Sequence, residues 1–173
     1  VQRSAGILGV PTDVDGAAAL DVYRSRGPDA PPLSLYAHLP FCESMCTYCG
    51  CNVVIDKDHR LEHGYLDTLL QEIDLAAEAL GGGPRRVAQL HLGGGTPTFL
   101  SDAELRELMA MLKRSFTLAP GGEYSIEVDP RTIDAGRLDT LAELGFNRLS
   151  FGVQDFDPAV QKAVHRVQPA EQV

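Results

Sequence analysis

The stretch YAHLPFCESMCTYCGCN, residues 36–52, contains all four cysteines of this 173-residue chain. They are Cys42, Cys46, Cys49 and Cys51, so four thiols fall within ten consecutive residues. Residues 33–39, LSLYAHL, lead into the first cysteine and alternate apolar and polar side chains, which predicts a β-strand that ends before Pro40. A loop this rich in thiols predicts either a metal centre or a set of disulfides.

Outward from this loop, the sequence repeats a strand–loop–helix pattern. Apolar residues recur at helical spacing downstream of the loop, and Ser101 with Glu104 forms the pattern of a capping box at one helix start. The predicted helices are 61–80, 101–116, 134–144 and 157–167, and the further strands are 86–92, 123–129 and 146–154, with a short extended piece at 52–56.

This order predicts an α/β fold with a parallel sheet and right-handed crossovers. About four βα units correspond to half of an eight-unit (β/α) barrel of the TIM type. We therefore divide the chain into an N-terminal leader or linker, residues 1–32, and an incomplete barrel domain, residues 33–173. A half-barrel leaves a sheet edge and apolar faces uncovered, so we expect a fragment that is inactive and prone to aggregation by itself.

Composition and charge narrow the classes of partner and compartment. The formal net charge is −9, which disfavours nucleic acid as a partner. No apolar run approaches the length of a membrane span, and the first residues do not resemble a secretory signal. We therefore expect a cytoplasmic protein, in a reducing compartment where disulfides rarely persist.

The spacing of the cysteines distinguishes a structural zinc site from an iron–sulfur cluster. A structural zinc site normally takes two pairs of ligands from separated segments, whereas all four thiols here come from one loop. Closely spaced cysteines are typical of iron–sulfur clusters, and Cys42, Cys46 and Cys49 can reach three corners of a cubane. Cys51 could supply a fourth ligand, but its spacing from Cys49 is short, which favours a cluster with one open iron.

Six motifs, in order from about residue 33 to residue 169, resemble those of the radical S-adenosylmethionine enzymes. They are YAHLPFC, CGCN, HLGGGTPTFL, SIEVDPR, GFNRLSFGVQDFD and VQKAVHRVQP. Within that superfamily they resemble the oxygen-independent coproporphyrinogen III oxidase family. The resemblance implies a 4Fe–4S cluster on Cys42, Cys46 and Cys49, with Cys51 as a family cysteine that is not a ligand.

The resemblance also implies residues that bind S-adenosylmethionine. By their matching positions, Tyr36, Gly94 and Glu127 would contact the molecule at the open iron. The contacts to a second molecule of S-adenosylmethionine would come from Tyr48, Gly95, Thr96, Gln154 and Arg166. Without the resemblance, Glu127 would be read as part of the solvent face of a strand, and Arg166 as an exposed charge on the helix 157–167.

The implied reaction is the oxidative decarboxylation of two propionate groups of coproporphyrinogen III to vinyl groups, giving protoporphyrinogen IX. Its implied partners are this tetrapyrrole and a reductant protein of the flavodoxin or ferredoxin type. The full-length enzyme is expected to be a monomer. A haem chaperone of the same superfamily is the nearest alternative. Its cysteine loop usually lacks the equivalent of Cys51, and further along the chain it tends to have Ser where this chain has Asp155, so both features favour the oxidase family. A structural zinc protein is a more distant alternative.

Overall fold

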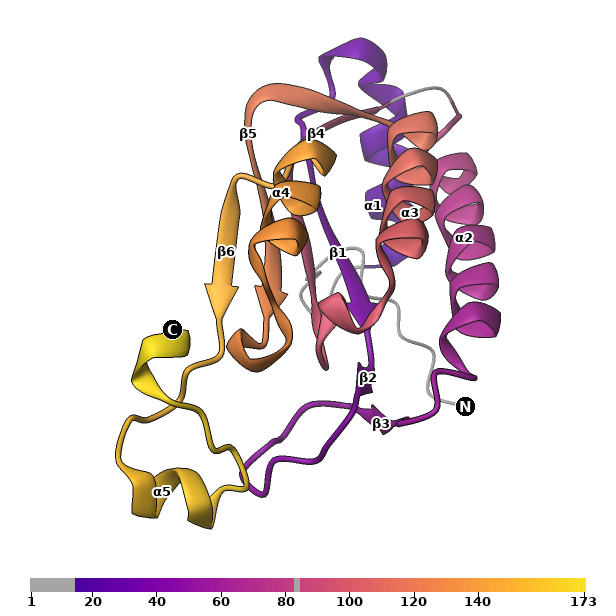
Figure 1. Ribbon diagram of the computed structural model, residues 1–173. Coiled ribbons are helices and arrows are strands. Elements are labelled where there is room, and N and C mark those ends of the chain that lie inside the picture. Colours follow the sequence, from indigo (N-terminus) through magenta and orange to yellow (C-terminus); the bar gives the residue numbers. More distant parts are fainter. Residues whose placement is uncertain (1–14, 83–84) are drawn as a thin grey trace.

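The computed structural model describes residues 15–82 and 85–173. Within these ranges the core is a four-stranded parallel sheet with the strand order β1–β4–β5–β6. The strands are β1 (Leu33–Leu39), β4 (Arg85–Gly94), β5 (Phe116–Val128) and β6 (Arg148–Phe151). Because strands that follow one another along the chain are neighbours, the sheet matches the expected part of a (β/α) barrel (Figure 1).

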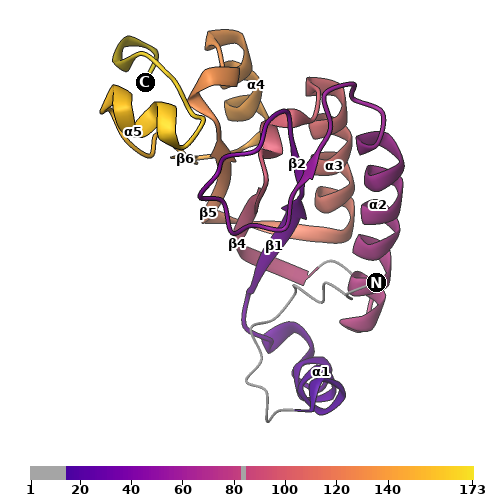
Figure 2. The same ribbon diagram turned by 90° about the horizontal axis from the view of Figure 1, so that it is seen from below.

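Three helices cover one face of this sheet. They are α2 (Glu62–Ala79), α3 (Asp102–Ser115) and α4 (Ala135–Leu144), and they follow β1, β4 and β5 along the chain (Figures 1 and 2). Leu90, Leu92 and Ile126 are almost fully buried between the sheet and the helices. Burial of one such side chain contributes about 1.5–3 kcal/mol, so this layer holds the strand ends in place.

The opposite face of the sheet is polar. On β1, residues of odd number are buried, whereas Ser34, Tyr36 and His38 point to the other side and remain partly or fully exposed. His91 pairs with both Tyr36 and Ser125 in the register of the neighbouring strands, which places all three on this inner face. In a (β/α) barrel such side chains point into the barrel, and a site, where there is one, forms at the C-terminal ends of the strands.

Three strands differ in length from the predictions. β4 spans Arg85–Gly94 and is longer than the predicted 86–92. β5 begins at Phe116 because Arg85–Val87 pair with Phe116–Leu118, before the register shifts. The intervening residues include Gly121, at φ 74°, so they leave the regular ladder without ending the strand. β6 spans Arg148–Phe151 and is shorter than the predicted 146–154.

The prediction of a helix over 157–167 was wrong in its second half. α5 spans Pro158–Ala163 and ends because His165 adopts a left-handed conformation at φ 56°. The amide of Arg166 then donates to the carbonyl of Gln161 at 2.8 Å, and that of His165 to Lys162 at 3.3 Å, which is a Schellman ending. Arg166 is therefore buried in the segment after the helix, and not an exposed helical charge.

The cysteine loop and the N-terminal region add smaller elements. β2 (Phe41–Cys42) and β3 (Val54–Ile55) pair in parallel and close the base of the loop. α1 (Gly16–Ser25) lies in the predicted leader, and its Arg24 side chain donates to the carbonyl of Ala79 at 2.6 Å. No helix in the described part of the chain has the length and apolar character needed to cross a membrane.

Candidate functional site

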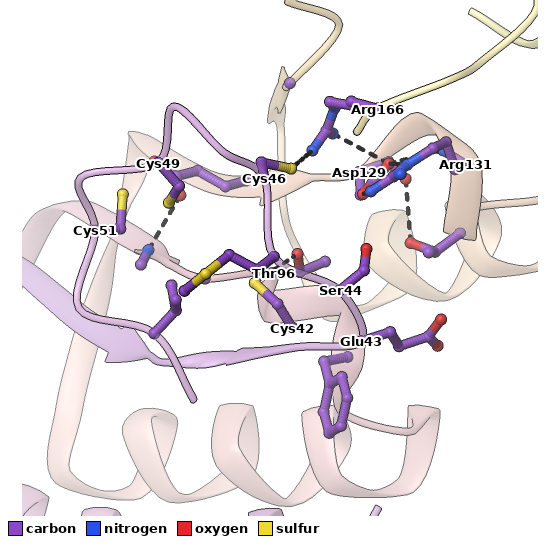
Figure 3. Close-up of a pocket in the computed structure, with 18 of the residues that line it drawn as sticks. Cys42, Glu43, Ser44, Cys46, Cys49, Cys51, Thr96, Asp129, Arg131 and Arg166 are labelled. Atoms are coloured by element: carbon purple, nitrogen blue, oxygen red, sulfur yellow. Dashed lines mark hydrogen bonds and ion pairs between the residues drawn. The ribbon is translucent and has the colours of Figure 1, made fainter. Parts of the chain in front are cut away.

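A pocket of about 620 Å³ opens at the C-terminal ends of the sheet strands. The cysteine loop, the glycine-rich turn after β4, the end of β5 and the segment after β6 form its walls (Figure 3). Its lining includes ten of the eleven residues predicted for the site: Cys42, Cys46, Tyr48, Cys49, Gly94, Gly95, Thr96, Glu127, Gln154 and Arg166. The fold therefore brings together residues from four separate βα units.

Short-range hydrogen bonds fix the base of the cysteine loop. The amide of Asp56 donates to the carbonyl of Cys42 at 3.1 Å, which continues the β2–β3 pair. The carboxylate of Asp56 in turn accepts the amides of Asp58, Arg60 and Leu61, each at 3.0 Å. The bond from Arg60, with those from the other two amides, holds the pKa of Asp56 below its usual value despite the opposing effect of burial.

None of the four cysteines forms a disulfide, and all four line the pocket. Burial raises the pKa of Cys42 above its usual value; a hydrogen bond with the Thr96 hydroxyl, at 3.5 Å, lowers it in part, and Cys49 and Cys46 add to the rise. Burial also raises the pKa of Cys51, with a further contribution from Cys49. Bound iron would favour the thiolate forms of these side chains, because thiolates are the ligands of iron–sulfur clusters.

The donor set consists of thiols from one loop. Among residues 15–82 and 85–173, no three His, Cys, Asp or Glu side chains converge so as to hold one metal ion. A cubane instead takes one thiolate on each of several separate irons, and Cys42, Cys46 and Cys49 line one pocket from one loop. These three residues fit a 4Fe–4S cluster, and the remaining pocket leaves space beside it.

The glycine-rich turn packs directly against the cysteine loop. The amide of Gly95 donates to the carbonyl of Leu39 at 2.9 Å, and that of Thr96 to the carbonyl of Phe41 at 2.8 Å. A Cβ atom on Gly95 would lie 2.7 Å from the carbonyl oxygens of Pro40 and Phe41, so only glycine allows this approach. Gly94 adopts φ 120°, a conformation that other residues rarely take.

Glu127 and Tyr36 are linked through His91 on the inner face. Glu127 accepts the amide of Gly94 at 3.0 Å, and its other oxygen lies 3.4 Å from Nε2 of His91. The Tyr36 ring stacks on His91 with centroids 5.7 Å apart, and its hydroxyl shares a hydrogen bond of 3.0 Å with His38. Tyr36 is the predicted residue that stands outside the pocket lining, and it pairs with His91, three residues before Gly94 on β4.

The sequence-based reasoning gave no role to Asp129 and Arg131, which also line the pocket. The carboxylate of Asp129 is buried, and accepts two side-chain nitrogens of Arg131, the shorter contact being 2.6 Å, and Nη2 of Arg166 at 3.1 Å. Burial raises the pKa of Asp129, but the hydrogen bonds and charges of the two arginines outweigh it and lower the pKa. The signal was present in SIEVDPR, where an acid and a base flank a proline at a strand end.

Comparison with known proteins gives one family and a consistent group of relatives. The model of the radical SAM superfamily matches residues 36–173. The chain is 52% identical over 143 residues to the oxygen-independent coproporphyrinogen III oxidase of Pseudomonas aeruginosa, covering 82% of this chain and 31% of that protein. It is 49% identical over 140 residues to the Escherichia coli protein of the same name, covering 81% of this chain and 30% of that protein.

A solved structure agrees with these relatives. Coproporphyrinogen III oxidase from Escherichia coli, described as a radical SAM enzyme, superposes with a TM-score of 0.81 at 45% identity. The match covers 92% of this chain and 36% of that one. The chain thus spans about a third of the length of the proteins that it resembles, and corresponds to their N-terminal part.

Proposed function

The chain belongs to the radical SAM superfamily, and on that basis we propose that it forms the N-terminal part of an oxygen-independent coproporphyrinogen III oxidase. The observation that carries the proposal is the meeting of Cys42, Cys46 and Cys49 with Gly94 and Glu127 around one pocket. The complete enzyme would convert two propionate side chains of a tetrapyrrole to vinyl groups, each with loss of carbon dioxide, one hydrogen atom and one electron, with S-adenosylmethionine as the oxidant. A cytoplasmic location and a flavodoxin-type or ferredoxin-type electron donor belong to the same proposal.

In this proposal the cysteines hold a 4Fe–4S cluster that leaves one iron open. When bound, the cluster supplies the electron that cleaves S-adenosylmethionine and so starts hydrogen abstraction from the propionate. The protein contributes the position of the ligand. The turn at Gly94, whose amide donates to Glu127, has no side chain there and lets the backbone approach S-adenosylmethionine closely. The carboxylate of Glu127 can accept hydrogen bonds from the amino or hydroxyl groups of this ligand.

The other predicted residues would serve a second molecule of S-adenosylmethionine. Tyr48, Gln154 and Arg166 line the same pocket as the cysteines. The Arg166 guanidinium group has N–H donors beyond those directed at Asp129 and Cys46, and these can bind the carboxylate at the amino-acid end of this ligand. Gln154 has φ 70°, so its backbone is held in a conformation that costs energy outside glycine, as often occurs at ligand sites.

The test is a product assay on the full-length protein, reconstituted with iron and sulfide without oxygen. With dithionite, S-adenosylmethionine and coproporphyrinogen III, we expect protoporphyrinogen IX and carbon dioxide. Transfer of haem to an acceptor protein without decarboxylation would instead support the haem chaperone. Zinc without iron or sulfide in the anaerobically purified protein would support a structural metal site and refute the proposal.

A further inference from the structure

Arg166 lies between a buried carboxylate and a cysteine of the loop. Its Nη2 atom is 3.1 Å from Oδ1 of Asp129, and its Nη1 atom donates to Sγ of Cys46 at 3.5 Å (Figure 3). Resting on the proposed cluster site, we propose that Arg166, positioned by Asp129, donates a hydrogen bond to the Cys46 sulfur and raises the reduction potential of the cluster. Asp129 is then a positioning residue, since it acts through Arg166.

Both members of the ion pair between Asp129 and Arg166 are buried. Asp129 is 6% exposed and Arg166 is 8% exposed, so neither charge is well solvated. A buried guanidinium group requires a compensating carboxylate, and Asp129 supplies it from the end of β5. Loss of the carboxylate would leave Arg166 without that compensation and free to turn away from Cys46.

The backbone around Arg166 is attached to the same part of the cysteine loop. The amide of Thr47 donates to the carbonyl of Val164 at 3.4 Å, and the Thr47 hydroxyl to that of Ala163 at 3.2 Å. The turn at His165 then directs the Arg166 side chain towards Cys46, the residue before Thr47. Three contacts between segments about 120 residues apart therefore fix the donor relative to the sulfur.

The expected effect follows from the charge of the cluster. One-electron reduction adds negative charge to the irons, sulfides and thiolates. An N–H donor on a ligating sulfur, carrying a positive charge, stabilises the reduced form more than the oxidised form. Removing that donor should shift the midpoint potential to a more negative value.

The experiment measures the midpoint potential of the reconstituted full-length protein by dithionite titration, followed by electron paramagnetic resonance. S-Adenosylmethionine is left out, so that a contact of Arg166 with that ligand cannot contribute. The variants are Arg166→Gln, Arg166→Lys, Asp129→Asn and the double variant Asp129→Asn/Arg166→Gln. Arg148→Gln is the control, because it removes an equal charge from an exposed pair with Glu123 that does not line the pocket.

The direction of the shift separates positioning from simple charge. We expect Arg166→Gln and Asp129→Asn each to lower the potential, and Arg148→Gln to leave it unchanged. Loss of the negative charge of Asp129 would by itself raise the potential. We therefore expect Asp129→Asn to raise the potential only in the Arg166→Gln background, where there is no arginine left to position. Arg166→Lys keeps the charge and should lower the potential less than Arg166→Gln.

Three results would overturn the inference. A midpoint potential in Arg166→Gln equal to that of the wild type would show that the hydrogen bond to Cys46 does not affect the cluster. An upward shift for Asp129→Asn in both backgrounds would make Asp129 a nearby charge and nothing more. Failure of both Arg166 variants to load iron would also overturn it, because a donor that is not a ligand should be dispensable for assembly. If the wild-type protein loads no cluster, it is the proposed function that fails.

Discussion

Cys51 is two residues from Cys49 and lines the same pocket, yet we propose that it is not a ligand. Serine at Cys42, Cys46 or Cys49 is expected to abolish the cluster, because each removal leaves an iron without its thiolate. Serine at Cys51 should leave iron and sulfide at wild-type levels. Analysis of both elements after anaerobic reconstitution of each full-length variant checks this, and loss of iron in Cys51→Ser would contradict the open-iron site.

Gly95 tests whether the glycine-rich turn supports the cysteine loop. In Gly95→Ala the new Cβ would meet the carbonyl oxygens of Pro40 and Phe41 at 2.7 Å, so the two loops must separate. We expect the full-length variant to retain less than about a tenth of the wild-type affinity for S-adenosylmethionine, a loss of about 1.4 kcal/mol or more. Equilibrium binding to the reconstituted protein measures it.

Gly64→Ala is the matched control, since a Cβ atom on Gly64 would meet nothing within 4 Å in α2. It should leave the affinity unchanged and stabilise the helix by up to about 1 kcal/mol. Equal affinities in Gly95→Ala and the wild type would show that the close approach of the two loops is not needed for the site.

Residues of the site differ in how far the sequence could predict them. The cysteines and the glycine-rich turn are local motifs, so their grouping at one sheet edge followed from the strand order. The contact of Arg166 with Asp129 joins residues 37 positions apart through a turn at His165 that nothing in the local pattern indicates. The sequence therefore predicted most of the residues that line the pocket and missed the buried ion pair of Asp129 and Arg166.

At the scale of elements, α3 begins with a capping box that the sequence predicted and the structure confirmed. The Ser101 side chain accepts the amide of Glu104, and the Glu104 carboxylate accepts the amide of Ser101 at 2.8 Å. Ser101→Ala is expected to lower the free energy of unfolding by about 1 kcal/mol. Denaturant unfolding measures it, with Ser34→Ala on the exposed face of β1 as a control that should change little.

Asp102 gives α3 and α4 a pH-dependent connection. Burial raises the pKa of Asp102, but hydrogen bonds from Thr140 and Arg137 and the charges of Arg137 and Arg106 prevail and lower the pKa. A carboxyl group with a lowered pKa contributes stability above its ordinary pKa of about 3.9, and loses it as the pH falls through the folded value. Stability should therefore fall less steeply with acid below about pH 4 in Asp102→Asn than in the wild type. Thermal unfolding across that range measures the slopes, and equal slopes would contradict the assignment.

The lengths of elements depended on contacts that local patterns do not contain. β1 was predicted with its observed bounds because Pro40 ends it and its alternation is regular. β5 was predicted too short, because its first residues are strand only through pairing with Arg85–Val87. The capping and periodicity of a segment thus predicted its type, whereas tertiary pairing determined where it ended.

At the scale of the molecule, the described sheet has an uncovered edge at β6. Phe151 lies on that edge and is 42% exposed, and Phe156 and Val167 are exposed nearby in the chain. An open edge beside apolar side chains pairs readily with other chains. The 173-residue polypeptide produced alone is therefore expected to aggregate.

Phe151→Lys should reduce this aggregation, because a charge on an edge strand opposes pairing. Leu75→Lys, at an exposed leucine of α2 away from the edge, is the control and should have little effect. Light scattering during size-exclusion chromatography compares the three proteins. A monodisperse wild-type polypeptide would show that the edge is not exposed in solution.

The central claim is that three cysteines of one loop hold a cluster that cleaves S-adenosylmethionine. The most direct measurement is the 5′-deoxyadenosine formed by the anaerobically reconstituted full-length protein with dithionite and S-adenosylmethionine, together with its iron and sulfide content. The account predicts one 4Fe–4S cluster for each chain and 5′-deoxyadenosine that requires Cys42, Cys46 and Cys49. A fully loaded protein that forms no 5′-deoxyadenosine in the presence of coproporphyrinogen III would contradict it.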